Sequence, residues 1–199
     1  VGLIDDPEHV TTQWFKDEGD AVILLGEPVA ADSLQGLGGS AYLQVLHETK
    51  NGTPPTCDLA TERTLCTTVL GLIQSGVVKS AHDCSEGGLA VALAECCFSE
   101  LQARNTPRFI GAEIDLAAFE ESRLDALLFG EAGARVVITT AALDAVKTVE
   151  RAKLLGVSAR QIGTVSSDEL KIKTTAGAHT WKVAGLHDLW WNAIGNAMA

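Results

Sequence analysis

The sequence of 199 residues carries 26 acidic side chains against 15 lysines and arginines, so its formal net charge is -11 at pH 7. A chain of this length with 46% apolar residues is expected to form one domain with a substantial core. Its acidic balance argues against nucleic acid as a partner, because phosphate backbones are bound by clustered lysines and arginines. The longest strongly apolar run, Ala21–Leu25, is too short to cross a membrane, so we expect no membrane-spanning segment.

Cysteine usage and the first residue bear on the origin of the chain. The cysteines are odd in number and include no pair separated by two residues, which argues against a disulfide framework and against zinc. We therefore expect buried, reduced thiols and a cytoplasmic location. The chain starts at Val1 rather than at methionine, so we expect a piece of a longer polypeptide. The cysteines are Cys57, Cys66, Cys84, Cys96 and Cys97.

Apolar runs and helix breakers predict strands that alternate with helices. In chain order we expect a strand at 20–27, a glycine-rich loop at 30–40, helices at 41–47 and 59–74, a strand at 77–84 and a helix at 89–101. There follow a strand at 109–114, a helix at 116–127, a strand at 134–140, a helix at 141–155, strands at 160–165 and 169–175, and a helix from 185 to the end.

Residues 166–168, two serines and an aspartate, are typical of a tight turn, so we expect the last two strands to form a hairpin. Strands that alternate with helices and then end in a hairpin indicate at least one antiparallel pair in the sheet. The pattern as a whole predicts an α/β (α+β) fold, with a mixed, partly antiparallel sheet covered by helices.

The first candidate binding loop joins a predicted strand to a predicted helix at 81–89. Two consecutive glycines, Gly87 and Gly88, allow a tight turn and leave room beside their amides. Free N–H groups at a helix start attract anions, so this loop predicts a phosphate site. Ser85 is expected to cap the helix, and Asp83 to hold a loop amide or Mg²⁺. An ordinary capped turn is the structural alternative.

A second candidate loop places the carboxylate of Glu131 close to the guanidinium of Arg135. An arginine can hold a phosphate through two parallel hydrogen bonds, which makes Arg135 a candidate ligand for a nucleotide. The alternative is that Arg135 forms an ion pair with Glu131. The residues by themselves leave both alternatives open.

A third loop has Gly38, Gly39 and Ser40 directly before a predicted helix, and the same argument about free amides applies. It lacks the Gly-Lys-Ser/Thr ending of a P-loop. His82 and Asp83 are adjacent on a predicted strand and so point to opposite faces, which argues against a dyad. The histidines have no spacing typical of metal ligands. We therefore predict no catalytic residue and no metal site within this chain.

Five motifs occur in an order that resembles phosphoribosylformylglycinamidine synthase. More closely, the chain resembles the last domain of the synthase subunit, which is of the AIR synthase-related C-terminal type. The resemblance covers nearly the whole chain, and its most specific part is the long block at 82–95. It implies that residues 1–18 are an inter-domain strand or linker from a missing upstream ATP-binding domain, and that residues 19–199 form the C-terminal domain. The motifs are VGLIDD at 1–6, LLGE at 24–27, LGGSAYL at 37–43, HDCSEGGLAVALAE at 82–95 and IGTV at 162–165.

The resemblance implies a purine-biosynthetic ligase, an ATP-dependent amidoligase. Such an enzyme uses ATP and Mg²⁺ to activate the amide of formylglycinamide ribonucleotide (FGAR), and ammonia from glutamine then displaces the phosphate. The implied partners are the upstream domains of the same subunit, a glutaminase subunit or domain, and small-molecule substrates. The family's catalytic histidine, principal metal ligands and nucleotide loop belong to upstream segments, so we expect this chain to be inactive alone.

The resemblance also bears on the candidate loops. In the family, a companion domain binds the substrate phosphate through a Glu-Ser-Gln loop, and the matching place here is Glu131-Ala132-Gly133. The missing hydroxyl moves our expectation to the loops at 83–88 and 38–40, facing a structural nucleotide site. Two alternatives stay open: a domain of another AIR synthase-superfamily enzyme, such as a selenophosphate synthase, and a non-catalytic interaction module.

Overall fold

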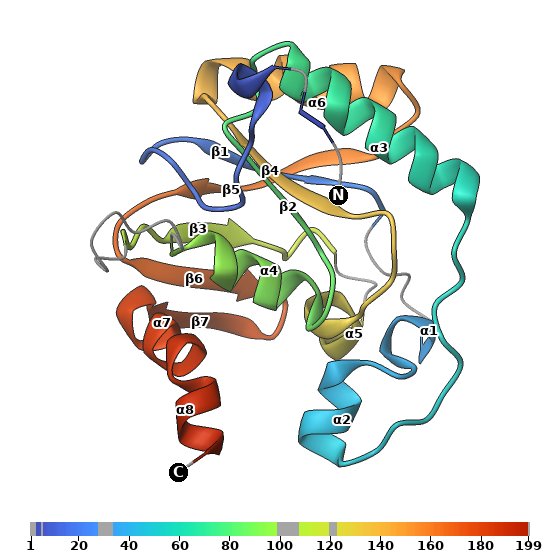
Figure 1. Ribbon diagram of the computed structural model, residues 1–199, viewed down its shortest axis with the longest axis vertical. Helices are drawn as coiled ribbons and strands as arrows, with labels where there is room; N and C mark the ends of the chain where they lie inside the picture. The colour runs from blue at the N-terminus through green and yellow to red at the C-terminus, as the bar shows by residue number, and fades with distance from the viewer. Residues whose placement is uncertain (1–2, 5, 28–33, 99–107, 120–122, 199) are drawn as a thin grey trace.

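A single mixed sheet organises the computed structural model, which describes residues 3–4, 6–27, 34–98, 108–119 and 123–198 (Figure 1). Within these residues the sheet has seven strands in the order β2-β4-β1-β5-β3-β6-β7. β3 and β6 are parallel, and the other neighbouring pairs are antiparallel. The predicted mixed, partly antiparallel sheet is therefore confirmed. The strands are β1 (Ala21–Leu25), β2 (Ser80–Asp83), β3 (Ala112–Asp115), β4 (Val136–Thr140), β5 (Ala159–Val165), β6 (Glu169–Thr174) and β7 (Gly177–Lys182).

Helices pack on both faces of the sheet. The helices are α1 (Leu34–Leu37), α2 (Ala41–His47), α3 (Leu59–Gln74), α4 (Gly88–Cys96), α5 (Leu124–Phe129), α6 (Ala145–Leu154), α7 (Val183–Trp191) and α8 (Ala193–Ala197), with short 3-10 turns at Pro7–His9 and Ala142–Asp144. Figure 1 shows α3 and α6 together at one end of the molecule, and α2 and α8 at the other. In the part of the chain that the structure describes, no helix combines the length and the apolar character needed to span a bilayer.

β1 is buried along its whole length and divides the core into two parts. Ala21, Ile23 and Leu25 face the cluster built with α3 and α6, while Val22 and Leu24 face the cluster built with α4. Successive side chains of a strand point to opposite faces, so an all-apolar strand needs cover on both. Each large side chain buried in this way contributes about 1.5–3 kcal/mol. The continuous run of apolar residues thus explains why β1 lies inside the sheet.

The hairpin predicted at residues 166–168 is wrong. β3 lies between β5 and β6 and pairs with both of them. The connection passes around the start of β3, where Gly111 donates to the carbonyl of Ser167 (2.8 Å) and accepts from the amide of Ser166 (3.0 Å). A Cβ on Gly111 would lie 1.9 Å from the carbonyl oxygen of Glu169, so only glycine leaves space for this crossing. A turn signal predicts a reversal of the chain, but not which strand lies between its arms.

The hairpin that the structure does contain is β6–β7, in which Thr174 pairs with Gly177. β7 is missing from the predicted strands, because its residues are exposed on an edge of the sheet and have no apolar run. The final helix is also divided, into α7 and α8, and begins at Val183 rather than at residue 185.

Several predicted boundaries change as well. The helix predicted at 116–127 is wrong in its first part, because residues 116–119 are not helical and contain a turn at 117–118. Helix α5 begins at Leu124, and residues 120–122 lie outside the described part of the chain. α1 lies inside the predicted loop at 30–40. The strand predicted at 77–84 shortens to β2. The helix predicted at 89–101 begins at Gly88 and ends at Cys96, and its last three predicted residues lie outside the described part of the chain.

The segment around Thr12 and Phe15, before β1, packs on the domain. Thr12 forms a parallel bridge with Ser80, and Phe15 is fully buried in the core beside α4. The amide of Phe15 donates to the carbonyl of Cys96 at 2.8 Å. These contacts attach the end of the 1–18 segment to the domain. Its assignment to a linker from an upstream domain stays a prediction.

The crossing at Gly111 leads to a stability prediction. Gly111→Ala should lower the free energy of unfolding by about 1–3 kcal/mol, because the new methyl group overlaps the carbonyl of Glu169. Gly185→Ala, in helix α7 with nothing within 4 Å of its Cβ position, should leave stability unchanged or raise it by up to about 1 kcal/mol. Chemical unfolding followed by circular dichroism measures both, and equal effects would contradict the packing argument.

Candidate functional site

Glu131 lies where the three candidate loops meet. It follows α5 directly, and its Oε1 accepts from the amide of Ala41 at 2.8 Å and from the amide of Gly87 at 2.9 Å. The amide of Glu131 donates in turn to the carbonyl of Gly36 at 2.7 Å. One carboxylate thus binds the amides of Gly87 and Ala41, which lie 44 and 90 positions before Glu131 in the sequence. The structure brings the predicted loops together around this single side chain.

The glycines of these loops have structural reasons for being glycine. Gly87 and Gly88 adopt φ of +80° and +68°, which L side chains rarely adopt. A Cβ on Gly88 would lie 2.7 Å from the carbonyl oxygen of Gly130, so α4 begins in close contact with the end of α5. A Cβ on Gly38 would lie 2.0 Å from the carbonyl oxygen of Thr53. The turns and the close packing within the domain therefore already explain why these positions are glycine.

The two serines among the candidates behave differently. Ser40 is buried and caps α2, because its Oγ accepts from the amide of Leu43 at 3.3 Å. The predicted cap of α4 by Ser85 is wrong, since Gly87 is the residue at that position and adopts a left-handed conformation. The hydroxyl of Ser85 donates instead to the carboxylate of Asp83. This hydrogen bond is the main reason that the pKa of Asp83 lies below its ordinary value.

Arg135 binds the backbone of the loop that carries Glu131. Its side chain is buried, and its guanidinium donates to the carbonyl oxygens of Gly130 (2.5 Å) and Ala132 (3.2 Å). Its third nitrogen, Nη1, is buried and has no hydrogen-bond partner in the part of the chain that the structure describes. Desolvation lowers the pKa of the guanidinium. Of the two alternatives, an ion pair with Glu131 is not what the structure shows, because Arg135 binds backbone carbonyls on either side of that residue.

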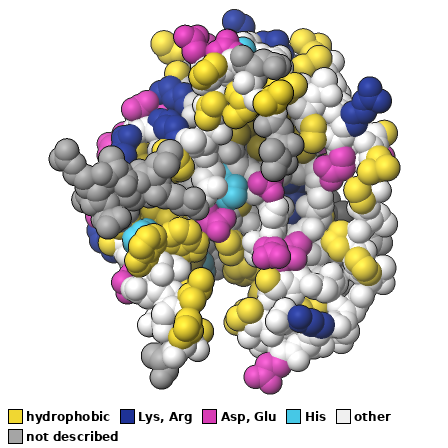
Figure 2. All heavy atoms as spheres, viewed as in Figure 1, with side chains coloured by type: hydrophobic (Ala, Val, Ile, Leu, Met, Phe, Trp, Pro, Cys, Tyr) yellow, Lys and Arg dark blue, Asp and Glu magenta, His cyan; other side chains and the backbone are white. Residues whose placement is uncertain are grey.

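His82 has a partner that sequence reasoning misses. Its Nε2 lies 2.8 Å from Oε2 of Glu95 on α4, whereas its Nδ1 is 3.6 Å from the nearer carboxylate oxygen of Asp83. The latter distance is too long for a hydrogen bond, as the positions of adjacent strand residues suggest. Figure 2 shows acidic side chains around a histidine near the centre of the face drawn there. The signal in the sequence was that Glu95 follows His82 by 13 residues and lies on the helix that comes after the strand of His82.

The nine candidate residues differ in what they offer a ligand. Gly39, Asp83 and Ser85 are exposed, Glu131 is half-buried, and Gly38, Ser40, Gly87, Gly88 and Arg135 are buried. The amides of Gly39, Ser40 and Gly88 already donate to carbonyl oxygens within the domain, at 2.9–3.0 Å. These three amides are therefore already paired within the domain, and nucleotide contact by the nine residues stays a prediction. Among the described residues, no three acidic, histidine or cysteine side chains are close enough to hold a metal ion.

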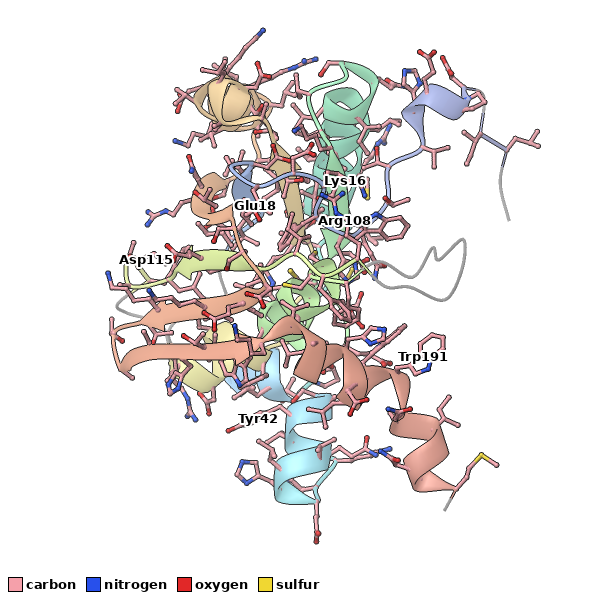
Figure 3. All side chains as sticks on the ribbon, turned by 90° about the vertical axis from the view of Figure 1, so that its left-hand side faces the viewer. Lys16, Glu18, Tyr42, Arg108, Asp115 and Trp191 are labelled. Carbon is pink, nitrogen blue, oxygen red and sulfur yellow. The ribbon has the colours of Figure 1, made fainter. Side chains whose placement is uncertain are left out.

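An apolar cleft of about 760 Å³ opens between α4, α5, the strands β6 and β7, and the helices α7 and α8. Figure 2 shows hydrophobic side chains on both sides of a cleft at the lower end of the molecule. In Figure 3 Trp191 points away from the domain, and its exposed fraction is 62%. Exposed apolar patches of this kind are typical of surfaces that contact another protein or domain. Residues that line the cleft include Val91, Phe98, Leu128, Trp181, Leu189 and Trp190.

The fold and these loops define a domain of one known class. The family described as "AIR synthase related protein, C-terminal domain" matches residues 17–174, so the chain belongs to this family. The phosphoribosylformylglycinamidine synthase subunit PurL of an Anaeromyxobacter species is 38% identical over 198 residues, which are 98% of this chain and 24% of that protein. The resemblance found in the sequence motifs is thereby confirmed. The chain spans about a quarter of the length of the curated relatives it matches.

Solved structures agree on the fold. "T. maritima PurL complexed with FGAR" is similar with a TM-score of 0.71 at 16% identity, over 90% of this chain and 30% of that one. "T. maritima PurL complexed with ATP" is similar with a TM-score of 0.65 at 17% identity, over 90% of this chain and 27% of that one. At such low identity these likenesses carry the architecture and nothing about individual ligand contacts.

The cysteines give a prediction about reactivity. Burial raises the pKa of Cys84 to about 11 and of Cys97 to about 12, and raises that of Cys96 strongly, whereas Cys57 and Cys66 are exposed. Only the thiolate is nucleophilic, so at pH 8 iodoacetamide should modify two cysteines rapidly and three slowly or not at all. Mass spectrometry of the native and the urea-unfolded protein counts the labels. Rapid labelling of all five in the native state would contradict the described core.

Proposed function

We propose that this chain is the C-terminal domain of a phosphoribosylformylglycinamidine synthase, acting in purine biosynthesis. The observation that carries the proposal is the match of 98% of the chain, at 38% identity, to about a quarter of a curated synthase subunit. The family profile supports the same assignment over residues 17–174. In this reading the domain is one part of a larger enzyme, which amidates FGAR with ammonia derived from glutamine.

The chemistry of the whole protein would depend mainly on segments outside this chain. ATP, when bound with Mg²⁺, supplies the phosphoryl group that activates the amide of FGAR. His82 is paired with the carboxylate of Glu95, and the buried cysteines are poor nucleophiles because their pKa values are raised. We therefore assign no catalytic residue to this domain. Its contribution is to support, through a rigid set of loops, whatever ligand site the neighbouring domains complete.

The partners follow from the surface of the domain. The apolar cleft and the exposed Trp191 support a contact with upstream domains of the same polypeptide, because burying such a surface in a neighbour stabilises the assembly. A glutaminase subunit or domain would supply ammonia to the whole enzyme. Free cysteines are in keeping with our proposal of a cytoplasmic location.

Nucleotide contact by the nine candidate residues stays a prediction for the whole protein. Asp83 and Ser85 are the side chains best placed for it, since both are exposed at the carboxyl end of β2. A lowered pKa keeps Asp83 ionised at neutral pH, and a carboxylate favours Mg²⁺ over a bare phosphate. Magnesium commonly uses one or two carboxylates together with nucleotide oxygens, so a contact through Mg²⁺ is the form that we propose.

Turnover tests the assignment of the chain to the enzyme. With ammonia supplied, the intact protein that carries this domain should form ADP from ATP and FGAR, whereas the 199-residue chain alone should form none under the same conditions. Coupled ADP detection measures both, with circular dichroism of the isolated chain to establish that it is folded. An intact protein without this activity would refute the proposed function, and turnover by the folded chain alone would refute the division of roles.

The nucleotide contact has its own test. In the intact protein, Asp83→Asn should weaken binding of Mg²⁺–ADP by about tenfold, which corresponds to about 1.4 kcal/mol. Glu86→Gln is the matched control, because it removes the same charge from an exposed position three residues away. Calorimetric titration gives both affinities. Equal affinities for the wild type and the Asp83 variant would remove this residue from the proposed site.

A further inference from the structure

We propose that Glu131 is a built-in anion, which occupies the position where the turns at Ser40–Ala41 and Gly87–Gly88 would otherwise present free amides to a phosphate. The proposal goes beyond the function proposed above and does not depend on it. In this proposal, one carboxylate pairs with amides that could otherwise bind a ligand anion, and it joins three segments that are distant in sequence.

The first step is the geometry at the carboxylate. One oxygen of Glu131 accepts from two backbone amides, at 2.8 Å from Ala41 and 2.9 Å from Gly87. Ala41 is the first residue of α2, and Gly87 directly precedes α4. The N–H groups at helix starts have no acceptor within their own helix, and negative charge is favourable beside them. A phosphate oxygen would make the same two bonds, so the carboxylate takes the place of a ligand anion.

The second step is that Glu131 is held in position. Its own amide donates to Gly36 at 2.7 Å, and the buried guanidinium of Arg135 binds the carbonyls of Gly130 and Ala132 on both sides of it. Burying a guanidinium without a carboxylate partner costs free energy, and within the described residues its Nη1 has no hydrogen-bond partner. This cost is understandable if Arg135 serves to fix the loop that aims the Glu131 carboxylate.

The third step is that little remains for a second anion. The amides of Gly39, Ser40 and Gly88 donate to the carbonyls of Asn51, Leu37 and Ser85, respectively. An incoming phosphate would also meet the negative charge of Glu131 itself, and like charges at short range repel. The turn that resembles an anion site in sequence is therefore satisfied from within the domain.

The test asks whether removal of the carboxylate opens an anion site. Thermal unfolding of the intact protein is measured in inorganic phosphate and in chloride at equal ionic strength, for the wild type, Glu131→Ala, Glu131→Gln and the exposed control Glu86→Ala. We expect Glu131→Ala to unfold at a lower temperature than the wild type, and phosphate to raise its unfolding temperature by several degrees. We expect no phosphate-specific shift for the wild type or for the control. Glu131→Gln still fills the space and should be destabilised without gaining a phosphate response.

Three results would overturn the proposal. The first is a phosphate shift of equal size in the wild type and in Glu131→Ala, and the second is no phosphate shift in the folded Ala variant. If Glu131→Ala is obtained unfolded, its refolding is compared in phosphate and in chloride of equal ionic strength. The proposal expects a several-fold higher yield of folded protein in phosphate. Equal yields would be the third. None of these measurements uses FGAR or amidation, so they stay separate from a failure of the proposed function.

Discussion

The burial of both faces of β1 is the constraint on which the rest of the structure depends. Its five residues are apolar and fully covered, so helices must pack on both sides of the sheet. α3 and α6 cover one side, and α4 covers the other. Because α4 starts at Gly88 against the end of α5, the core also determines where the candidate loops lie. The site is thus a consequence of how the hydrophobic faces are closed.

The carboxylate of Glu131 links this core to the small helices at the edge of the domain. α2 has no fully buried residue, and its apolar contacts are made by the partly buried Tyr42 and Leu43, with Tyr42 stacked on Phe129 of α5. The hydrogen bond from Ala41 to Glu131 and the cap by Ser40 add polar contacts to these. A hydrogen bond to a charged group contributes about 1.5–3 kcal/mol, which is a large share of the stability of a small domain. The position of α2 therefore depends on an interaction that leaves no trace in local sequence patterns.

The surface divides into an acidic face with satisfied loops and an apolar cleft with exposed tryptophans. Asp83 and Glu131 occupy the former, and Trp181, Trp190 and Trp191 lie in or beside the latter. Glu95 lies at the boundary, since it binds His82 and also lines the cleft. An acidic face favours metal-bound nucleotides over bare phosphates, whereas an apolar cleft favours another protein surface. This division is in keeping with the proposed role of the domain, in which β7, α7 and α8 contact a neighbouring domain.

The sequence by itself determined the class of fold, the apolar strand β1 and the family, because each depends on residues close together in the chain. Hydrophobic periodicity and caps act over a few residues, and a motif block such as 82–95 is contiguous. Only the tertiary structure decided that β3 separates β5 from β6, that His82 pairs with Glu95, and that Glu131 accepts hydrogen bonds from the amides of two turns. The sequence shows which residues carry hydrogen-bond donors or form strands. It does not show their partners, because many acceptors could satisfy the same group and the packing of distant segments determines which one does.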